Sequence, residues 1–498
     1  MLNTSELNTS FATERVLPVV GAQQGIWLAD QISPVKNGYT VAHYVELQGR
    51  IDLQCLRDAI RIGLSEADTP HTRFMESADG LVQVLPITCQ ADTLPEPGYR
   101  DLSANADPVA AAFALMGADL EHALPADTPE PLYHHLLLRV AAHEVSERWF
   151  WYQRYHHVCV DGYSFAALTR RMAEIYNALR QGRAVGESPF VSFAEVIEEH
   201  NAYQISEIRQ RDQRFWKDYA TQLATPVSLS TCDAASAQTF ANTEVHRERF
   251  MLDANTVAQL TALGHERRLS ATEMAMSGVF AYLHRMTGAE NLVVGIPFMR
   301  RMGSVAISAV GPVVNVLPLQ LHVEPRLCLG ELAQRLAAEL KRVRRHQRYD
   351  AEQLQRDIGL VGSHRALYGP TLNLKIYDQG LNMEGVQGVT HLLAAGPVED
   401  LEFGLWQEGD ALVIELAANP ARYAAIELHL HGTRLAGFLH ALLAGESLTI
   451  GDIPLPGADE QAALEAWSQG PSLTPQAEDV HTVLDIFLQQ VRTQGTQR

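Results

Sequence analysis

Two spacings of apolar residues alternate along this chain. Short runs of β-branched and aromatic residues are typical of strands, and longer segments with apolar residues every three or four positions are typical of amphipathic helices. We therefore expect strands at 39–47, 72–75, 81–85, 132–141, around Trp149, and at 244–252, 292–296, 313–321, 371–377, 401–406 and 411–417. Helices are expected at 22–30, 51–64, 110–120, 164–180, 192–220 (as one or two), 255–267, 271–287, 332–347, 424–443 and 483–491. The mixture predicts an α/β fold.

The predicted elements fall into two groups. Residues 181–191, which contain two glycines, a serine and a proline, favour a linker between them. At 498 residues the chain is long enough for more than one core, so we expect an N-terminal lobe at 1–180 and a C-terminal lobe at 192–453. Residues 454–498 are expected to form a second linker and the start of a following domain that is cut short here.

Composition narrows the possible partners. The chain has 59 acidic and 39 basic side chains and a formal net charge of −20, so no nucleic-acid partner is expected.

No run approaches the ~18 apolar residues of a membrane span, and residues 1–15 are too polar for a signal peptide. The five cysteines have no Cys-x-x-Cys spacing, which indicates neither a zinc site nor a disulfide framework and fits the reducing cytoplasm.

The candidate chemistry lies in residues 155–164, Tyr-His-His-Val-Cys-Val-Asp-Gly-Tyr-Ser. An aromatic strand precedes this stretch and an apolar helix follows it, so two histidines leave the end of a strand and Ser164 is expected to cap the helix. Such loops, held by rigid elements, are common places for catalytic groups. Another pair, His134-His135, lies in a second apolar strand without a following Asp-Gly. Only His156-His157 has the pattern His-His-x-x-x-Asp-Gly.

Other catalytic motifs are incomplete. The stretch Gly162-Tyr163-Ser164-Phe165-Ala166 lacks the last glycine of a nucleophile elbow, which argues against a serine hydrolase. His143-Glu144 lacks the second histidine of a zinc-binding helix, and neither a phosphate-binding Gly-Lys-Ser loop nor a dinucleotide-binding glycine pattern occurs. We therefore expect no metal site.

Several motifs, in order along the chain, resemble those of one family. His-His-x-x-x-Asp-Gly is the signature of the condensation domains of non-ribosomal peptide synthetases, and residues 22–27, Ala-Gln-Gln-Gly-Ile-Trp, resemble the opening motif of that family. Residues 310–315 resemble its Val-Gly-x-Phe-Val-Asn motif with Val313 in place of Phe. Residues 295–301 resemble its Gly-x-Pro-x-x-Gly-Arg motif with Arg300 in place of Gly. Residues 346–350 and 356–357 stand where the last two motifs belong.

This resemblance covers nearly the whole chain and implies a fold and a reaction. The fold would be a V of two chloramphenicol-acetyltransferase-like lobes with the active site in a tunnel between them. The domain would bind no cofactor itself, because each substrate arrives on the phosphopantetheine arm of a carrier protein. An upstream aryl or acyl carrier supplies the donor thioester, a downstream peptidyl carrier domain supplies the acceptor, and an adenylation domain adjoins in the same chain. The acceptor α-amine attacks the donor thioester and forms an amide.

The resemblance also assigns roles to residues, and His157 is the one that faces the amine. A free α-amine has a pKa of ~7.7–8.0 and an ordinary histidine one of ~6.5, so a neutral imidazole can meet a partly neutral amine. We expect His157 to position the amine and to accept or shuttle its proton. The other expected roles are loop support by His156, a structural brace by Asp161 with Arg301 (or, as second choice, Arg73), backbone access at Gly162, and a tunnel wall or a plain buried strand position at Asn315.

The same residues distinguish between subtypes of the condensation domain and between this family and other classes of protein. The cyclisation subtype has aspartates in place of both histidines, and the remaining motifs favour the condensing over the epimerising type. The chain also resembles the serine modules of enterobactin-type siderophore synthetases, and this resemblance implies a 2,3-dihydroxybenzoyl donor and a serine-like acceptor. A non-catalytic platform that docks carriers is disfavoured because the motif is intact. A coenzyme A-dependent acyltransferase of the same fold is disfavoured because the histidine is doubled.

Overall fold

We analysed a computed structural model of the chain. It describes residues 14–33, 37–78, 80–142, 147–232, 245–361, 363, 365–375, 380–443, 448–470 and 482–494. The chain divides into one unit that ends at Ile453 and a second that starts at Pro454. Parts of some predicted segments, namely residues 1–13, Asp79, Glu244 and residues 376–377, lie outside the described residues.

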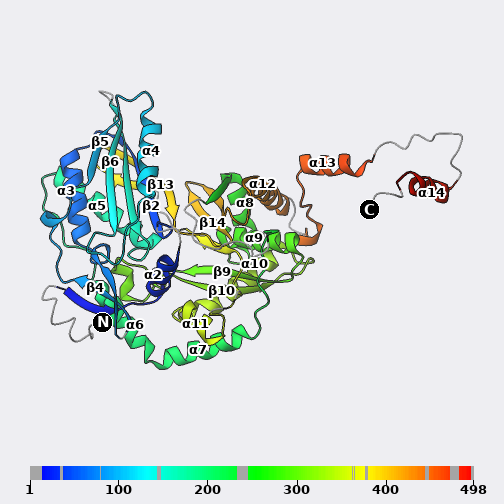
Figure 1. The fold of residues 1–498 in the computed structure, drawn as a ribbon, viewed down its shortest axis with the longest axis horizontal. Coiled ribbons are helices and arrows are strands. Elements are labelled where there is room, and N and C mark those ends of the chain that lie inside the picture. The colour runs from blue at the N-terminus through cyan, green and yellow to red at the C-terminus, as the bar shows by residue number, and fades with distance from the viewer. Residues whose placement is uncertain are drawn as a thin grey trace. The chain divides into compact units, whose positions relative to one another are not determined.

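The first unit is built on two six-stranded sheets (Figure 1). In order across it, the first sheet contains β12 (Gly380–Met383), β13 (Val386–Ala395), β2 (Thr40–Gly49), β7 (Glu147–His156), β6 (Tyr133–Ala142) and β5 (Gly98–Asp101). The second contains β10 (Asn315–His322), β9 (Asn291–Phe298), β11 (Thr371–Leu374), β14 (Leu401–Glu408), β15 (Ala411–Ala418) and β8 (His246–Leu252). A small third sheet contains β1 (Glu14–Pro18), β4 (Gly80–Pro86) and β3 (Arg73–Ser77). The prediction of a mixed α/β fold is confirmed.

Helices cover both faces of the first sheet. On one face, Val41, Val45 and Trp151 form a core with α3 (Leu53–Ser65) and α5 (Gly162–Arg180). On the other face, Tyr44 and Phe150 form a smaller core with α4 (Pro108–Leu120). This alternation along β2 and β7 follows from the two-residue period of a strand.

The remaining helices of the first unit surround the second sheet or join the two halves. They are α2 (Ala22–Ile32), α6 (Phe193–Gln204), α7 (Glu207–Ala220), α8 (Ala254–His265), α9 (Ala271–Thr287), α10 (Leu329–Arg344), α11 (Ala351–Asp357) and α12 (Ala425–Leu442). Short 3-10 turns occur elsewhere in the unit: η1 (Thr69–His71) packs on β4, η2 (Ala91–Thr93) packs on α3, and the others are η3 (Val305–Ser308) and η4 (Ile450–Asp452). Helix α9 is the most enclosed, since every residue from Met274 to His284 is buried. The segment expected at 192–220 forms two helices.

The two sheets are not built from separate halves of the chain. Strands β12 and β13 come from the second half, yet β13 pairs antiparallel with β2, with Ala395 opposite Val41. The next strand, β14, belongs to the second sheet. The chain therefore crosses from one sheet to the other between Ala395 and Leu401, a crossing that the sequence pattern did not indicate.

The described residues of the second unit form two helices, α13 (Ala458–Ser468) and α14 (Val483–Gln494). Both have exposed large apolar side chains, such as Trp467 and Phe487. Among the described residues, no helix of either unit has the length and apolar character needed to cross a membrane.

Candidate active site

The His-His-x-x-x-Asp-Gly loop joins β7 to α5. Asp161 is the N-cap of α5, and its Oδ1 accepts hydrogen bonds from the Ser164 backbone N–H at 2.9 Å and the Ser164 hydroxyl at 2.8 Å. The Ser164 Oγ in turn accepts from the Asp161 N–H at 2.9 Å, which completes a capping box. The prediction that Ser164 itself caps the helix is therefore wrong, because its hydroxyl is the second partner of the cap.

His157 is held with one ring nitrogen engaged. Its backbone N–H donates to the Tyr39 carbonyl at 2.8 Å, and its Nδ1 lies 3.1 Å from the Val160 carbonyl oxygen. A carbonyl only accepts, so Nδ1 carries the ring proton and Nε2 keeps a lone pair in the neutral ring. Burial lowers the pKa of His157, which keeps the imidazole neutral. The geometry leaves Nε2 as a proton acceptor.

His156 points inward. It is buried, its Nδ1 accepts from the Val158 N–H at 3.0 Å, and its Nε2 lies 3.7 Å from Oδ2 of Asp30 in α2. Because Nδ1 accepts, the neutral ring carries its proton on Nε2, facing the carboxylate. Nδ1 thus stabilises the loop, and Nε2 faces α2.

Asp161 is also bound to the second half of the chain. Arg301 Nη2 lies 2.9 Å from both Asp161 oxygens, and these two side chains are 0% and 1% exposed. The Val313 N–H donates to Asp161 Oδ2 at 3.1 Å. Arg301 also donates to the backbone carbonyls of Ala306, Ala309 and Gly311, so the buried charges are well supplied with partners. The other candidate, Arg73, pairs with Glu14.

Arg300, which stands in place of the glycine of the Gly-x-Pro-x-x-Gly-Arg motif, has a left-handed backbone conformation. It has φ +55°, the left-handed region that glycine adopts most easily, and it stands where the family motif has glycine. The left-handed turn is thus kept without the glycine. The Arg300 side chain pairs with Asp350 at 2.8 Å.

Gly162 lies at the surface of the molecule, whereas Asn315 is buried. Gly162 is exposed, and a Cβ there would meet nothing within 4 Å, so it leaves open space at the start of α5. Asn315 is buried, its Nδ2 donates to the carbonyls of Gln347 and Tyr349 at 2.9 and 2.8 Å, and its Oδ1 accepts from the Ala351 N–H at 3.1 Å. Both polar atoms of the Asn315 side chain are engaged by backbone groups, so the side chain fixes the turn at 347–351.

Gly396 is a site residue that the sequence did not indicate. It has φ +80°, and its N–H donates to the Thr40 carbonyl at 3.0 Å. A Cβ at this position would lie 2.9 Å from Cδ2 and 3.6 Å from Nε2 of His157. Glycine therefore lets the crossing segment lie against the edge of the imidazole that carries the lone pair. Pro397 follows it, but such a Gly-Pro pair marks a turn without showing what it contacts.

Comparison with known families decides the assignment. The family model of the condensation domain matches residues 13–465. The chain belongs to the condensation domain family. It is similar to enterobactin synthase component F of Escherichia coli O157:H7, with 43% identity over 90% of this chain and 34% of that protein. It is also similar to vanchrobactin synthetase VabF of Vibrio anguillarum, with 34% identity over 99% of this chain and 17% of that protein. The chain thus spans about a third or less of the length of these curated relatives.

Solved condensation domains share the fold. The starter condensation domain of rhizomide synthetase RzmA, as a variant in complex with C8-CoA, has a TM-score of 0.80 and 33% identity over 90% of this chain and 99% of that one. The first condensation domain of the calcium-dependent antibiotic synthetase, in complex with a substrate analogue, has a TM-score of 0.77 and 27% identity over 89% and 99%. As a member of the condensation domain family, this domain is an acyltransferase of the amide-forming class.

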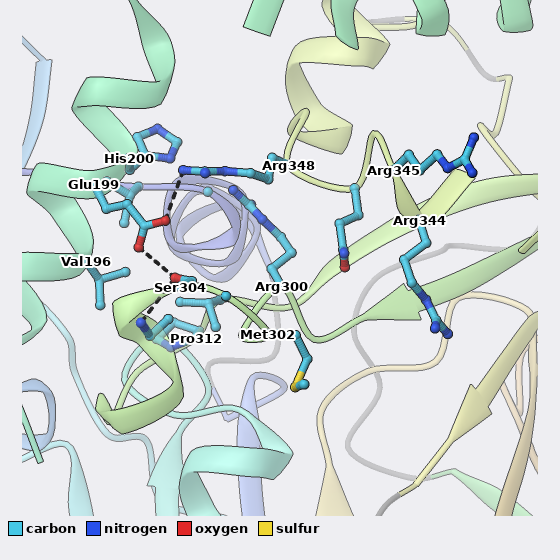
Figure 2. A pocket seen from close by; sticks show the side chains of 16 residues that line it. Val196, Glu199, His200, Arg300, Met302, Ser304, Pro312, Arg344, Arg345 and Arg348 are labelled. Carbon is cyan, nitrogen blue, oxygen red and sulfur yellow. Dashed lines mark hydrogen bonds and ion pairs between the residues drawn. The ribbon is translucent and has the colours of Figure 1, made fainter. Parts of the chain in front are cut away.

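A pocket adjoins the Asp161 loop of this condensation domain (Figure 2). Its volume is about 160 Å³, and Val313, which donates to Asp161, is one of its lining residues. On one side, Glu199 accepts from Ser304 and pairs with Arg348 at 3.2 Å. On this side of the pocket, the negative charge of Glu199 is therefore balanced by the positive charge of Arg348.

The other side of the pocket carries positive charge. Arg344 and Arg345, at the end of α10, line it (Figure 2). Neither forms an ion pair within the described ranges, whereas Arg300 is paired with Asp350. Both guanidinium groups are exposed and point away from Glu199 (Figure 2), and arginine suits phosphate because its planar fork presents several donors.

Replacing Gly396 by alanine in this condensation domain should impair catalysis more than stability. The new methyl would press on the His157 ring at 2.9 Å and the backbone would be strained, for which we expect a destabilisation of about 1 kcal/mol and a loss of activity of tenfold or more. The matched control is Gly409→Ala. Gly409 has φ +60°, but a Cβ there would meet nothing within 4 Å. Equal losses of activity in the two variants, measured at equal folded fraction, would show that the contact with His157 is unimportant.

Proposed function

We propose that this domain joins an aryl donor, 2,3-dihydroxybenzoyl, to a hydroxy-amino acid acceptor such as serine, each held as a carrier-bound thioester. The observation that carries the proposal is the neutral His157, whose Nδ1 is bound to Val160 O while Nε2 is left as an acceptor. The choice of substrates is supported by the relatives, which are named after the siderophores enterobactin and vanchrobactin.

In the proposed reaction, the acceptor nitrogen attacks the thioester carbonyl carbon, the C–N bond forms and the C–S bond breaks. The amine becomes strongly acidic as the C–N bond forms, so Nε2 of His157 can take its proton late in the reaction. The proton then passes to the departing sulfur, which leaves as the carrier thiol. Holding the two carrier-bound substrates in reacting geometry can lower the barrier by ~7–11 kcal/mol, so positioning is as important as proton transfer.

The proposal requires partners that bring the substrates. An upstream aryl carrier would present the donor and a downstream peptidyl carrier domain the acceptor, each through a phosphopantetheine arm. We further propose that residues 1–180 and 192–453 contribute the two lobes, with β12 and β13 of the second segment completing the first sheet, that 181–191 link them, and that 454–498 lead to an adenylation domain in the same chain. The support for the last step is that the curated relatives are much longer than this chain.

A transfer assay tests the proposal. The chain is incubated with a carrier loaded with 2,3-dihydroxybenzoyl and a second carrier loaded with serine, and intact mass spectrometry follows the second carrier. We expect a mass increase that corresponds to the aryl amide. No transfer from any carrier would favour a docking platform, and an equal rate from the aryl coenzyme A ester would favour a coenzyme A-dependent acyltransferase.

The arginine-lined side of the pocket gives a separate prediction. If Arg344 and Arg345 bind the phosphate of one phosphopantetheine arm, the variant Arg344→Ala/Arg345→Ala should have a KM about tenfold higher for one carrier-bound substrate. The matching N-acetylcysteamine thioester, which lacks the phosphate, should react equally with both proteins. Arg326→Ala, an exposed arginine at a distance in sequence from the pocket, serves as control. An equal loss with both kinds of thioester would contradict phosphate binding.

A further inference from the structure

Tyr163 directly follows the His-His-x-x-x-Asp-Gly motif and contacts the arginine that braces it. The Cζ of Arg301 lies 4.5 Å from the centroid of the Tyr163 ring, so the guanidinium stands over the aromatic face. A cation in this position is attracted by the negative face of the ring, most strongly where water is excluded. Because Arg301 is 0% exposed, the contact with Tyr163 is of this desolvated kind.

The hydrogen bonds of Arg301 leave part of its guanidinium unsatisfied. Its two terminal nitrogens are bound by the Asp161 carboxylate and by three backbone carbonyls. Its Nε–H is buried and has no acceptor atom among the residues that the structure describes. A buried donor without a partner is costly, and an aromatic face is a weak acceptor. The ring of Tyr163 thus adds to the stabilisation of a cation whose hydrogen bonding is incomplete.

The Tyr163 hydroxyl connects the start of α5 to the turn that holds Arg301. It donates to the Ile307 carbonyl, in η3, at 3.2 Å. The carbonyls of Ala306, in the same turn, and of Ala309, directly after it, accept from Arg301. The ring and the hydroxyl of Tyr163 therefore contact the same arrangement of charge and carbonyl groups.

The Tyr163 ring also lies between the ion pair and solvent. Gly162, directly before it, is exposed, and a Cβ there would meet nothing within 4 Å, so water reaches the start of α5. Tyr163 is partly exposed, whereas Asp161 and Arg301 are 1% and 0% exposed. An ion pair that is kept from water is stronger than one that water and salt can reach. The ring over the guanidinium therefore strengthens the pair by shielding it.

The orientation of His157 depends on this ion pair. Asp161 follows Val160, whose carbonyl oxygen lies 3.1 Å from Nδ1 of His157. Because Asp161 is held both by the cap of α5 and by Arg301, the direction of the Val160 carbonyl is fixed. A movement of that carbonyl would turn the imidazole, and a misplacement of about 1 Å can lower the rate about 100-fold.

We propose that Tyr163 is a positioning residue of the amide-forming reaction. Its ring keeps the Asp161–Arg301 pair free of water, and the pair in turn holds the loop that orients His157. The inference rests on the role of His157 in the proposed function, but it does not depend on which donor and acceptor are joined.

Transfer between loaded carriers, measured on the complete chain, tests the effect on catalysis. Tyr163→Ala should lower kcat about tenfold and leave the KM for both carriers unchanged, because it disturbs the orientation of His157 and no surface that binds substrate. Tyr163→Phe keeps the ring over the guanidinium, so its kcat should stay within about twofold of wild type. The matched control is Tyr99→Ala. Tyr99 is a partly exposed tyrosine of the edge strand β5, with the Cζ of Arg57 5.8 Å from its ring centroid.

Hydrogen exchange provides a second measurement that needs no substrate. The backbone N–H groups of Ser164 and Val313 both donate to Asp161, at 2.9 and 3.1 Å. In Tyr163→Ala these two amides should exchange about tenfold faster than in wild type, and the difference should grow with added salt, which screens a pair that water reaches. In Tyr163→Phe they should exchange as in wild type. Mass spectrometry of peptides that contain the two amides measures the rates.

Several results would overturn the inference. An unchanged kcat of Tyr163→Ala, or an equal loss in Tyr99→Ala, would show that the ring has no special effect on the reaction. An equal loss in Tyr163→Phe would assign the effect to the hydroxyl, and a raised KM would mean that Tyr163 binds substrate or carrier. If wild type forms no amide, the proposed function fails, and the exchange rates alone decide the inference. If Tyr163→Ala does not fold, Tyr163→Leu, which keeps apolar volume without an aromatic face, takes its place with the same expected pattern.

Discussion

His157→Ala should reduce amide formation by about 10²–10⁴-fold while the chain stays folded, because a group that transfers a proton in the transition state is typically worth that much. The measurement is the rate of aryl transfer between preloaded carriers, followed by intact mass. The imidazole packs against Gly396 and bonds to Val160 through one nitrogen, so its removal leaves the cap of α5 and the Asp161–Arg301 pair in place.

The internal control is the other histidine pair. His134 is half-exposed on β6, with its Nδ1 2.7 Å from Asp119, so His134→Ala should keep nearly full transfer activity. Added imidazole should restore part of the activity of His157→Ala if the residue acts mainly as proton acceptor, and none if it acts mainly by positioning. Near-wild-type transfer by His157→Ala, with carrier loading unchanged, would show that His157 has neither role.

Arg301→Met should lower the free energy of unfolding by about 3–5 kcal/mol, because it leaves the Asp161 carboxylate buried without its partner. The pair is almost fully enclosed, at 0% and 1% exposure, and Arg301 also holds three backbone carbonyls. Chemical denaturation followed by circular dichroism measures the change. Activity should fall as well, since Asp161 both caps α5 and fixes the loop of His157.

Two further variants test whether the unpaired charge of Asp161 is what destabilises Arg301→Met. Arg73→Met removes a partly exposed arginine that pairs with Glu14, and should cost about 0–1 kcal/mol. Combining Arg301→Met with Asp161→Asn removes the unpaired charge and should recover part of the lost stability. A loss of under 1 kcal/mol for Arg301→Met would refute the view that this ion pair is a main support of the site.

The sequence predicted those features that depend on residues close together in the chain, namely the bounds of the long helices and the residues of the motif. The period of the apolar residues gave the positions of α5 and α9 to within two residues, because each helix has a continuous apolar stripe and a polar residue at its start. The motif pointed to His157, Asp161 and Arg301, and the structure brings the last two together.

Contacts between distant segments were not predictable in this way. The strand β12 has only four residues, two of them Gly380 and Asn382, so its pattern is too short to recognise, and β13 gains its place only by pairing with β2. Asn315 lies on the expected strand, but whether its amide meets an open channel or the backbone at 347–351 depends on how that turn packs. The approach of Gly396 to His157 likewise arises only when the whole first sheet has formed.

The crossing of the chain from β13 to β14 limits how such domains can be recombined. An exchange of C-terminal halves with a cut at residues 181–191 would carry β12 and β13 into a foreign sheet, where β13 must match the register of β2 along nine residue pairs. The same fragment carries Gly396, so a poor match would displace the segment beside His157 even if every motif residue were kept. Exchanges that retain residues 380–400 together with the first sheet should therefore preserve activity more often.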